Sequence, residues 1–255
     1  MILAVDIGNS NIEIGCFEND EVLFIERLST NLQYTALEYV ISVKNILEIN
    51  NADPLKIEGC IISSVVPSVT QTVRSALERL TNADVLTVGP GIKTGLKIML
   101  DNPAQLGSDR VADAVAGINL YPVPLIIIDM GTATTVSVID KDKNYLGGMI
   151  IPGLRVSLDS LTKRTSQLPK IGLEPPKKII GTNTVECMKS GIIYYSAAGI
   201  DGVVQRIEKD MGESCTVVST GGLATKIIPH CEREIIIDEQ LLLKGLMIIY
   251  KKNKK

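Results

Sequence analysis

Two Asp-x-Gly turns are the first candidates for chemistry in this sequence. Asp6 and Gly8 follow one short aliphatic run, Asp129 and Gly131 follow another, and each turn continues into small hydroxyl- or amide-bearing residues. A single turn of this kind is usually only the turn of a β-hairpin. Two of them at matching positions favour a functional role, in which the carboxylate faces a metal-bound nucleotide and the neighbouring side chains donate hydrogen bonds to phosphate.

The two turns belong to an internal repeat. The segment LIIIDMGTATTVSVID aligns with LAVDIGNSNIEIGCF, so that Asp129 lies 123 residues after Asp6. Each copy has the pattern of an aliphatic strand, an Asp-x-Gly turn and a second, alternating strand. A period close to half the chain is too long for a solenoid and indicates a duplicated domain. We therefore expect two α/β domains, residues 1–115 and 116–255.

The elements that must position these turns alternate between strands and helices. A third strand-to-helix turn, Thr216–Ala224, carries paired glycines, which let a backbone approach a nucleotide closely. The helix expected over Glu186–Ile207 is apolar on most sides, which suggests that a second surface covers it. The other predicted strands are Ile2–Val5, Ile12–Phe17, Val22–Leu28, Gly59–Val66 and Asp84–Val88, and the other predicted helices are Thr35–Glu48, Ser68–Leu80 and Ser108–Leu120, the last with Ser108 as its cap.

Composition and missing motifs exclude several classes of protein. With 45% hydrophobic and 22% charged residues, the 255-residue chain is globular. The net charge of −3, the two Phe and the absence of Trp give no sign of nucleic-acid binding. No GxxxxGK[ST] loop is present, and His230 is the single histidine, so an HExxH site is impossible. An odd number of cysteines without a CxxC pair, no basic leader and no long apolar run predict a cytoplasmic protein.

Seven segments, taken together, resemble one known family. In chain order they are DIGNSN, SSVVPS, DNPAQLGSDR, IDMGTATT, GGMIIPG, NTVECMKSG and STGG. Their order and spacing are similar to those of the type III pantothenate kinases, which belong to the acetate kinase, sugar kinase, Hsp70 and actin superfamily. The resemblance spans nearly the whole chain. It implies a transferase with two actin-like (ribonuclease H-like) domains and a nucleotide cleft between them, which phosphorylates pantothenate with ATP in the first step of coenzyme A synthesis.

The resemblance also implies how the two turns act. Asp6 would hold Mg²⁺ through water, and Asp129 would help to bind a monovalent cation, K⁺ or NH₄⁺. The residues implied to contact ATP or its phosphates are Asp6, Gly8, Asn9, Ser10, Asn11 and Thr132.

The segment Gly107–Arg110 matches the pantothenate site of the family. By this resemblance Asp109 takes the proton of the primary hydroxyl, and the forked guanidinium of Arg110 suits the substrate's carboxylate. Gly107 and Ser108 belong to the same implied site, and Thr184 reaches the pantothenate site of the partner subunit in a homodimer. Without the rest of the pattern, GSDR reads as a helix cap with a surface ion pair.

The chain departs from the family pattern at two positions that bear on its site. Ser10 replaces the more usual Thr and keeps the hydroxyl, whereas Leu100 stands where many members have a Tyr that lines the substrate pocket. Two alternatives therefore stay open. One is a non-catalytic transcriptional accessory protein on the same fold, and the other is a kinase of another small hydroxy acid.

Overall fold

The computed structural model describes residues 1–19 and 21–254, which fold into two compact units. The first comprises Met1–Leu96, Asp101–Ala116 and the C-terminal segment from Leu241, and the second comprises Lys97–Leu100 and Gly117–Gln240. The domain boundaries expected from the repeat, 1–115 and 116–255, remain a prediction. The units differ from those domains in two respects: Lys97–Leu100 belongs to the second unit, and the last helix packs with the first.

A five-stranded sheet organises the first unit. Its strands are β1 (Ile2–Ile7), β2 (Asn11–Glu18), β3 (Glu21–Ser29), β4 (Gly59–Ser64) and β5 (Val85–Thr87), in the order β3-β2-β1-β4-β5. The first three strands form an antiparallel meander, and β4 and β5 run parallel to β1. The helices are α1 (Ala36–Ile49), α2 (Pro67–Thr81), the start of α3 (Ser108–Leu120) and α7 (Leu241–Asn253), with 3-10 turns at Pro54–Lys56 and Pro103–Gln105.

A six-stranded sheet organises the second unit. Its strands are β6 (Lys97–Ile98), β7 (Leu125–Met130), β8 (Ala133–Ile139), β9 (Asn144–Pro152), β10 (Thr216–Thr220) and β11 (Ile236–Ile237), in the order β11-β10-β7-β8-β9-β6. The helices of this unit are α4 (Leu154–Arg164), α5 (Thr184–Met211) and α6 (Ala224–Ile227), followed by a 3-10 turn at Ile228–His230.

The two sheets repeat one topology, which confirms the expected duplicated α/β fold of the actin-like type. In both sheets an antiparallel meander of three strands continues into two parallel strands, so β1 to β5 correspond to β7 to β11. Gly8 N–H donates to Asn11 O at 2.9 Å in the first turn, and Gly131 N–H donates to Ala133 O at 3.1 Å in the second. The repeat read from the sequence is therefore a repeat of structure.

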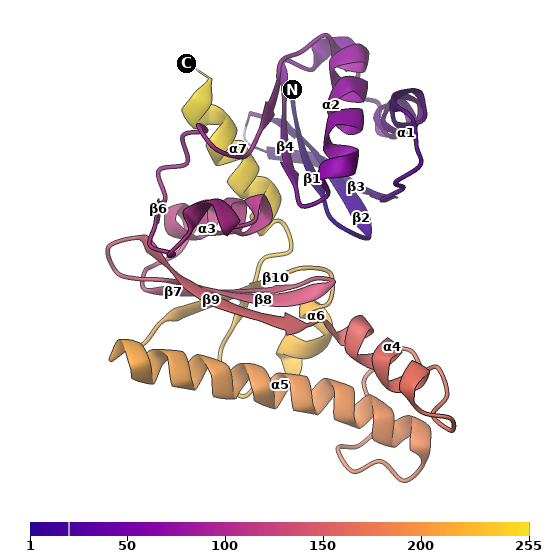
Figure 1. Ribbon diagram of the computed structural model, residues 1–255, viewed down its shortest axis with the longest axis vertical. Helices are drawn as coiled ribbons and strands as arrows, with labels where there is room; N and C mark the ends of the chain where they lie inside the picture. Colours follow the sequence, from indigo (N-terminus) through magenta and orange to yellow (C-terminus); the bar gives the residue numbers. More distant parts are fainter. Residues whose placement is uncertain (20, 255) are drawn as a thin grey trace. The chain divides into compact units, whose positions relative to one another are not determined.

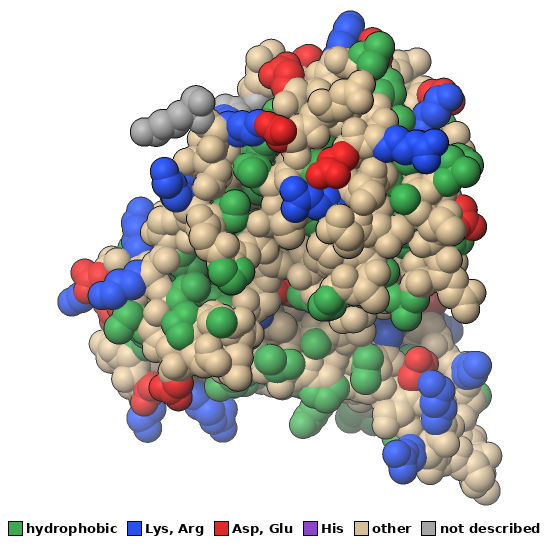
Figure 2. Space-filling model, turned by 45° about the horizontal axis from the view of Figure 1, so that its top comes forward, with side chains coloured by type: hydrophobic (Ala, Val, Ile, Leu, Met, Phe, Trp, Pro, Cys, Tyr) green, Lys and Arg blue, Asp and Glu red, His purple; other side chains and the backbone are tan. Residues whose placement is uncertain are grey.

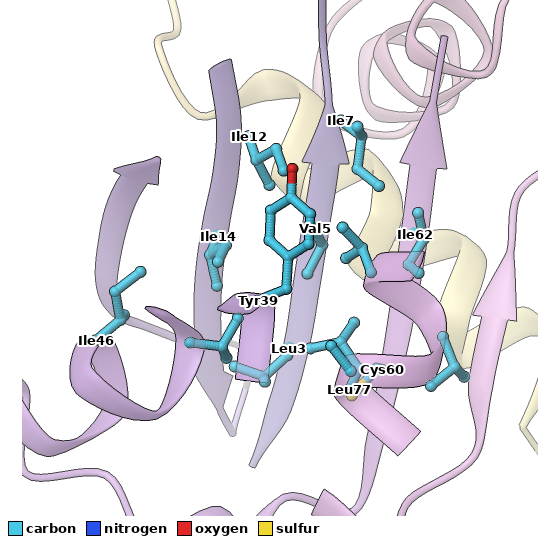
Figure 3. Packing of buried hydrophobic residues seen from close by; sticks show 14 of the residues in the cluster. Leu3, Val5, Ile7, Ile12, Ile14, Tyr39, Ile46, Cys60, Ile62 and Leu77 are labelled. Carbon is cyan, nitrogen blue, oxygen red and sulfur yellow. The ribbon is translucent and has the colours of Figure 1, made fainter. Parts of the chain in front are cut away.

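Helices α1 and α2 cover one face of the first sheet. Alternate side chains of β1, such as Val5, point toward this face and are fully buried. Tyr39 of α1 fills the layer between helix and sheet, and its ring lies between Ile14 of β2 and Val5 of β1 (Figure 3). Its hydroxyl donates to Asn31 O at 2.9 Å, so the ring is buried without losing its hydrogen bond. This layer holds β1, and with it Asp6, in place.

Helix α7 packs on the same sheet through small residues. A Cβ at Gly59 of β4 would meet the ring of Tyr250, at 2.6 Å from Cζ, and one at Gly15 of β2 would lie 2.9 Å from Leu243. On α7 itself, Gly245 lies so close to the backbone of Ala112 in α3 that a Cβ would come within 2.6 Å of its carbonyl carbon. The absence of side chains at these glycines sets how closely α7 approaches the sheet and α3.

Helix α5 covers one face of the second sheet (Figure 1). Its buried side, with Ile193, Ala197 and Val204, packs against Ile126 and Ile128 of β7. The helix extends beyond the expected Glu186–Ile207 at both ends. Asn183 caps its start by accepting from Glu186 N–H, and Gly212, in the left-handed conformation, ends it.

Charged side chains are mixed on the face drawn in Figure 2, where basic and acidic groups alternate without a patch of one sign. This mixture agrees with the net charge of −3. Within residues 1–19 and 21–254, none of the helices combines the length and apolar character that a membrane crossing requires.

Candidate active site

The first Asp-x-Gly turn lies at the end of β1 and is fastened from β3. Thr30 donates from its hydroxyl to Gly8 O at 2.6 Å and from its backbone N–H to Ser10 O at 3.0 Å. Asp6 is half-buried, and the side chains of Asn9, Ser10 and Asn11 are exposed. Because the backbone of this turn is already fixed, its exposed amide and hydroxyl groups can donate to phosphate oxygens without the entropic cost of ordering a loop.

Strand pairing connects this turn to a second group of candidate residues. Asp6 lies directly opposite Ser63 in the parallel register of β1 and β4, so both side chains stand on the same face of the sheet. Ser63 Oγ is 3.0 Å from Ser108 Oγ, at the start of α3. Asp6 and the beginning of α3 are therefore brought together within the first unit, although 102 residues separate Asp6 from Ser108.

Asp109 stands in the first turn of α3, where free backbone N–H groups and the helix dipole favour a negative charge. Its Oδ1 accepts from Arg110 N–H at 2.8 Å. The same oxygen lies over Gly107, where any Cβ would collide with it. Gly107 is thus required for the position of the Asp109 carboxylate. The expected capping role of Ser108 is wrong, because its hydroxyl bonds to β4 and not to its own helix.

The second Asp-x-Gly turn is enclosed by two glycines. A Cβ at Gly153, which precedes α4, would lie 2.7 Å from Gly131 O, and one at Gly221, which follows β10, would lie 2.7 Å from Met130 N. Gly221 has a φ of +86°, and a Cβ there would also collide with the carboxylate of Asp129. Asp129 is half-buried, whereas Thr132 is exposed at the tip of the turn. Close backbone packing at Gly153 and Gly221 therefore restricts how this turn can move.

The remaining predicted residues lie in the second unit. Leu100 is half-buried against Gly147 of β9, where a Cβ would be 3.6 Å from Leu100 Cδ2. Thr184 is exposed at the start of α5 and lines a pocket of about 440 Å³ between α4 and α5. The first unit therefore holds Asp6, the first turn and Gly107–Arg110, and the second holds Leu100, Asp129, Thr132 and Thr184.

Asp6 and Asp129 are suited to bind cations that are also coordinated by the phosphate oxygens of a nucleotide. Within the described residues no three His, Cys, Asp or Glu side chains gather into a metal site. Mg²⁺ in kinases usually takes one or two carboxylates and completes its shell with water and phosphate oxygens. Asp6 offers one half-buried carboxylate beside exposed polar groups, and Asp129 offers another beside the backbone of two glycines. Both oxygen-donor sets fit hard cations.

Several residues of the site were not assigned from the sequence. Thr30 follows β3, the third strand of the meander, and lies outside every quoted motif. Ser63 and Ser64 belong to SSVVPS, Gly153 to GGMIIPG and Gly221 to STGG. The motifs marked those four as part of a pattern, but only the fold shows what each one touches.

Comparisons with known proteins point to one family. The profile of the family described as type III pantothenate kinase matches residues 2–206. A type III pantothenate kinase of Exiguobacterium sp. is 43% identical over 255 residues, 100% of this chain and 100% of that protein. Another, of Halalkalibacterium halodurans, is 41% identical over 253 residues, 99% and 100% of the two chains. A solved structure from Campylobacter jejuni, described as a Baf family transcriptional activator, matches 98% of both chains with a TM-score of 0.60 and 20% identity, which shows a shared fold.

Proposed function

The chain belongs to the type III pantothenate kinase family, and we propose that it transfers the γ-phosphate of ATP to the primary hydroxyl of pantothenate, giving ADP and 4′-phosphopantothenate. One observation carries the proposal. Asp6 pairs with Ser63 in the sheet and Ser63 contacts Ser108, so the first turn and the Gly107–Arg110 segment lie together in one unit. We further propose that the reaction takes place in the cytoplasm, where thiols stay reduced; all five cysteines are unpaired.

Asp109 and Arg110 divide the recognition of pantothenate between them. Phosphoryl transfer needs positioning and charge stabilisation more than covalent chemistry. In our proposal the Asp109 carboxylate accepts the proton of the attacking hydroxyl, and the Arg110 guanidinium binds the substrate's carboxylate through two parallel hydrogen bonds. Gly107 and the backbone of Ser108 line the same site, and Leu100 forms part of the pocket wall. Consecutive residues at a helix start point about 100° apart, so the two charged side chains can serve opposite ends of one small molecule.

The two turns are proposed to hold ATP. Asp6 would bind Mg²⁺ through water, and the exposed groups of Asn9, Ser10 and Asn11, with the backbone of Gly8, would donate to phosphate oxygens. Thr132 would contact the nucleotide from the second turn, and Asp129 beside it would help to hold K⁺ or NH₄⁺. When bound, these cations supply positive charge against the phosphate oxygens.

A homodimer is the proposed assembly. One side of α5 is buried, but the opposite side exposes Gly191, Tyr195, Ala198 and Gly199, none of them charged. Tyr195 is 82% exposed, and the two glycines have nothing within 4 Å of a Cβ position. The small residues let another helix approach closely, and the exposed ring offers it apolar surface to bury. We propose that a second copy covers this face and that Thr184 thereby reaches the partner's pantothenate site.

A direct product assay tests the activity. The purified protein is incubated with ATP, Mg²⁺ and pantothenate, and 4′-phosphopantothenate and ADP are measured by chromatography and mass spectrometry. Parallel reactions replace pantothenate with other small hydroxy acids, and K⁺ with Na⁺ at equal ionic strength. Pantothenate should be the preferred acceptor, and K⁺ should raise the rate. Stronger turnover of another acceptor would change the substrate, and no turnover of any would favour the non-catalytic alternative.

Mixed dimers test the shared site. Asp109→Asn and Thr184→Arg chains are co-expressed with different tags, and the heterodimer is purified. If each site uses Asp109 of one subunit and Thr184 of the other, a heterodimer has one site with both changes and one with neither. The purified heterodimer should therefore have about half of wild-type activity, and the unfractionated mixture formed by random pairing about a quarter, while each parent stays nearly inactive. Confirmed heterodimers without activity would contradict the proposal.

A further inference from the structure

Three serines meet where β4 ends and α3 begins; we call Ser63, Ser64 and Ser108 the serine junction. Ser108 Oγ accepts from Ser64 N–H at 2.8 Å and donates to Ser64 O at 2.9 Å, and it is 3.0 Å from Ser63 Oγ. The strand end and the helix start lie 44 residues apart in sequence. The junction therefore fastens the first turn of α3 to the sheet through one side chain.

The hydroxyl of Ser108 is fully used in this arrangement. A serine hydroxyl has one proton to donate and two lone pairs to accept with. Its proton goes to Ser64 O, and one lone pair receives Ser64 N–H. The contact to Ser63 must then be a donation from Ser63, which takes the second lone pair. No hydrogen-bonding capacity remains on Ser108 for a substrate, so direct binding of pantothenate by this hydroxyl is not its role here.

The junction stands between the two halves of the chemistry in its unit. Ser63 is fully buried and directly opposite Asp6 in the β1–β4 register, while Ser108 immediately precedes Asp109. Ser64, at the strand end, is itself braced from α2, because its Oγ lies 2.7 Å from Thr70 Oγ1 and accepts Val66 N–H at 3.1 Å. A shift of the junction would move α3 and the Asp109 carboxylate relative to Asp6.

We propose that Ser63 and Ser108 are positioning residues of the kinase: their hydroxyls bond to each other to fix the Asp109 carboxylate at a set place relative to Asp6. This inference rests on the proposed function, since Asp109 is the group that would accept the proton there. A misplacement of about 1 Å can cost about 10²-fold in rate without changing which ligands bind. The junction should therefore govern kcat and leave the KM for ATP unchanged.

A double-mutant cycle tests this. The variants are Ser63→Ala, Ser108→Ala and the double variant, with Ser108→Thr as the conservative rescue. Ser42→Ala is the matched control, because Ser42 on α1 also bonds a backbone carbonyl, Glu38 O at 2.8 Å, but lies away from the junction. Rates are normalised to the folded fraction from far-UV circular dichroism, and hydrogen exchange follows the amides at the start of α3.

We expect Ser108→Ala to lower kcat about 10- to 100-fold with the KM for ATP unchanged, and Ser63→Ala to lower it by a smaller factor. The double variant should equal Ser108→Ala within about twofold, because both changes break the same bond. Ser108→Thr should restore most of kcat, and Ser42→Ala should have no effect. Amide exchange at the start of α3 should be faster in both alanine variants.

Two results would overturn the positioning role. If Ser108→Ala raised the KM for pantothenate with kcat unchanged while Ser63→Ala had no effect, Ser108 would be a direct substrate contact. If the two losses in kcat simply multiplied in the double variant, the hydroxyls would act separately. Wild type that makes no phosphopantothenate would reject the proposed function and this role together, whereas failure of the junction alone leaves wild-type activity intact.

Discussion

The backbone at Gly221 makes a sharp test of how the second turn is held. Replacing Gly221 with Ala puts a Cβ on a residue whose φ is +86°, against the Asp129 carboxylate and 2.7 Å from Met130 N. Gly212 offers a matched control. It also has a positive φ, of +72°, at the end of α5, but a Cβ there would have nothing within 4 Å. The pair separates the conformational cost from the steric one.

The expected magnitudes follow from these two environments. A left-handed conformation costs a residue with a Cβ about 1–2 kcal/mol, so Gly212→Ala should lose about 1 kcal/mol of unfolding free energy. Gly221→Ala adds a collision with backbone, and overpacking of this kind costs about 1–3 kcal/mol more. Relief requires Met130 and Asp129 to move by several tenths of an ångström. A displaced cation ligand should lower kcat about 10- to 100-fold and weaken the dependence on K⁺.

Stability is measured by urea unfolding followed by far-UV circular dichroism, since the chain has no Trp. Activity is measured as phosphopantothenate formed in K⁺ and in Na⁺ at equal ionic strength, which removes general screening as a cause. Gly212→Ala should keep the wild-type kcat and K⁺ response. If Gly221→Ala matched Gly212→Ala in both stability and kcat, the close packing around Asp129 would be irrelevant to the site and the reasoning refuted.

Three further changes follow, of which two test the proposed substrate site and one tests a buried hydrogen bond of the second unit. Asp109→Asn should lower kcat by about 10²–10⁴ with folding unchanged, and a near wild-type kcat in the product assay would exclude Asp109 as the base. Arg110→Lys should raise the KM for pantothenate and spare that for ATP, because lysine keeps the charge but not the fork; an equal rise in both would place Arg110 on the nucleotide. Tyr121 donates to buried Asp238 at 2.8 Å, and burial, with this bond, raises the pKa of Tyr121 to about 12. Tyr121→Phe should therefore cost about 1–3 kcal/mol of unfolding free energy at pH 8. A raised pKa gives stability below the unfolded pKa of about 10 that is lost as pH rises through about 12, so the difference from wild type should shrink over that window and a constant difference would contradict the assignment.

Short-range pattern was enough to locate the two turns. Aliphatic runs ending in Asp-x-Gly predict buried strands whose turns lie at one edge of a sheet, and the structure places Asp6 at the end of β1 and Asp129 at the end of β7. The two ends of α5 were harder to predict from the sequence. Asn183 and Glu186 have the spacing of a helix cap, and Gly212 is a common terminator, yet the apolar pattern alone stops short of both.

Contacts between residues far apart in the chain could not be predicted from local sequence patterns. A serine before a helix predicts a cap, but Ser108 bonds to a strand end 44 residues away, and no local signal distinguishes the two uses. Helix α7 is a similar case. It packs with the first unit, where Gly59 of β4 leaves room for Tyr250 and Gly245 lies against the backbone of α3. Small residues on a strand reveal such a contact only once the partner is known.

The duplicated fold allows two similar turns to take the different tasks that we propose for them. Asp6 and Asp129 occupy equivalent ladder positions, opposite Ser63 of β4 and Thr220 of β10 respectively. Beyond that point the halves diverge. The end of β4 presents hydroxyls that bond to the start of α3, where Asp109 and Arg110 are neighbours, which suits an acceptor substrate that must be oriented. The end of β10 continues into Gly221, whose missing side chain leaves backbone against Asp129 and suits close approach to an ion or a phosphate. The same acid therefore stands beside strand-end hydroxyls in one copy and beside close-packed backbone in the other.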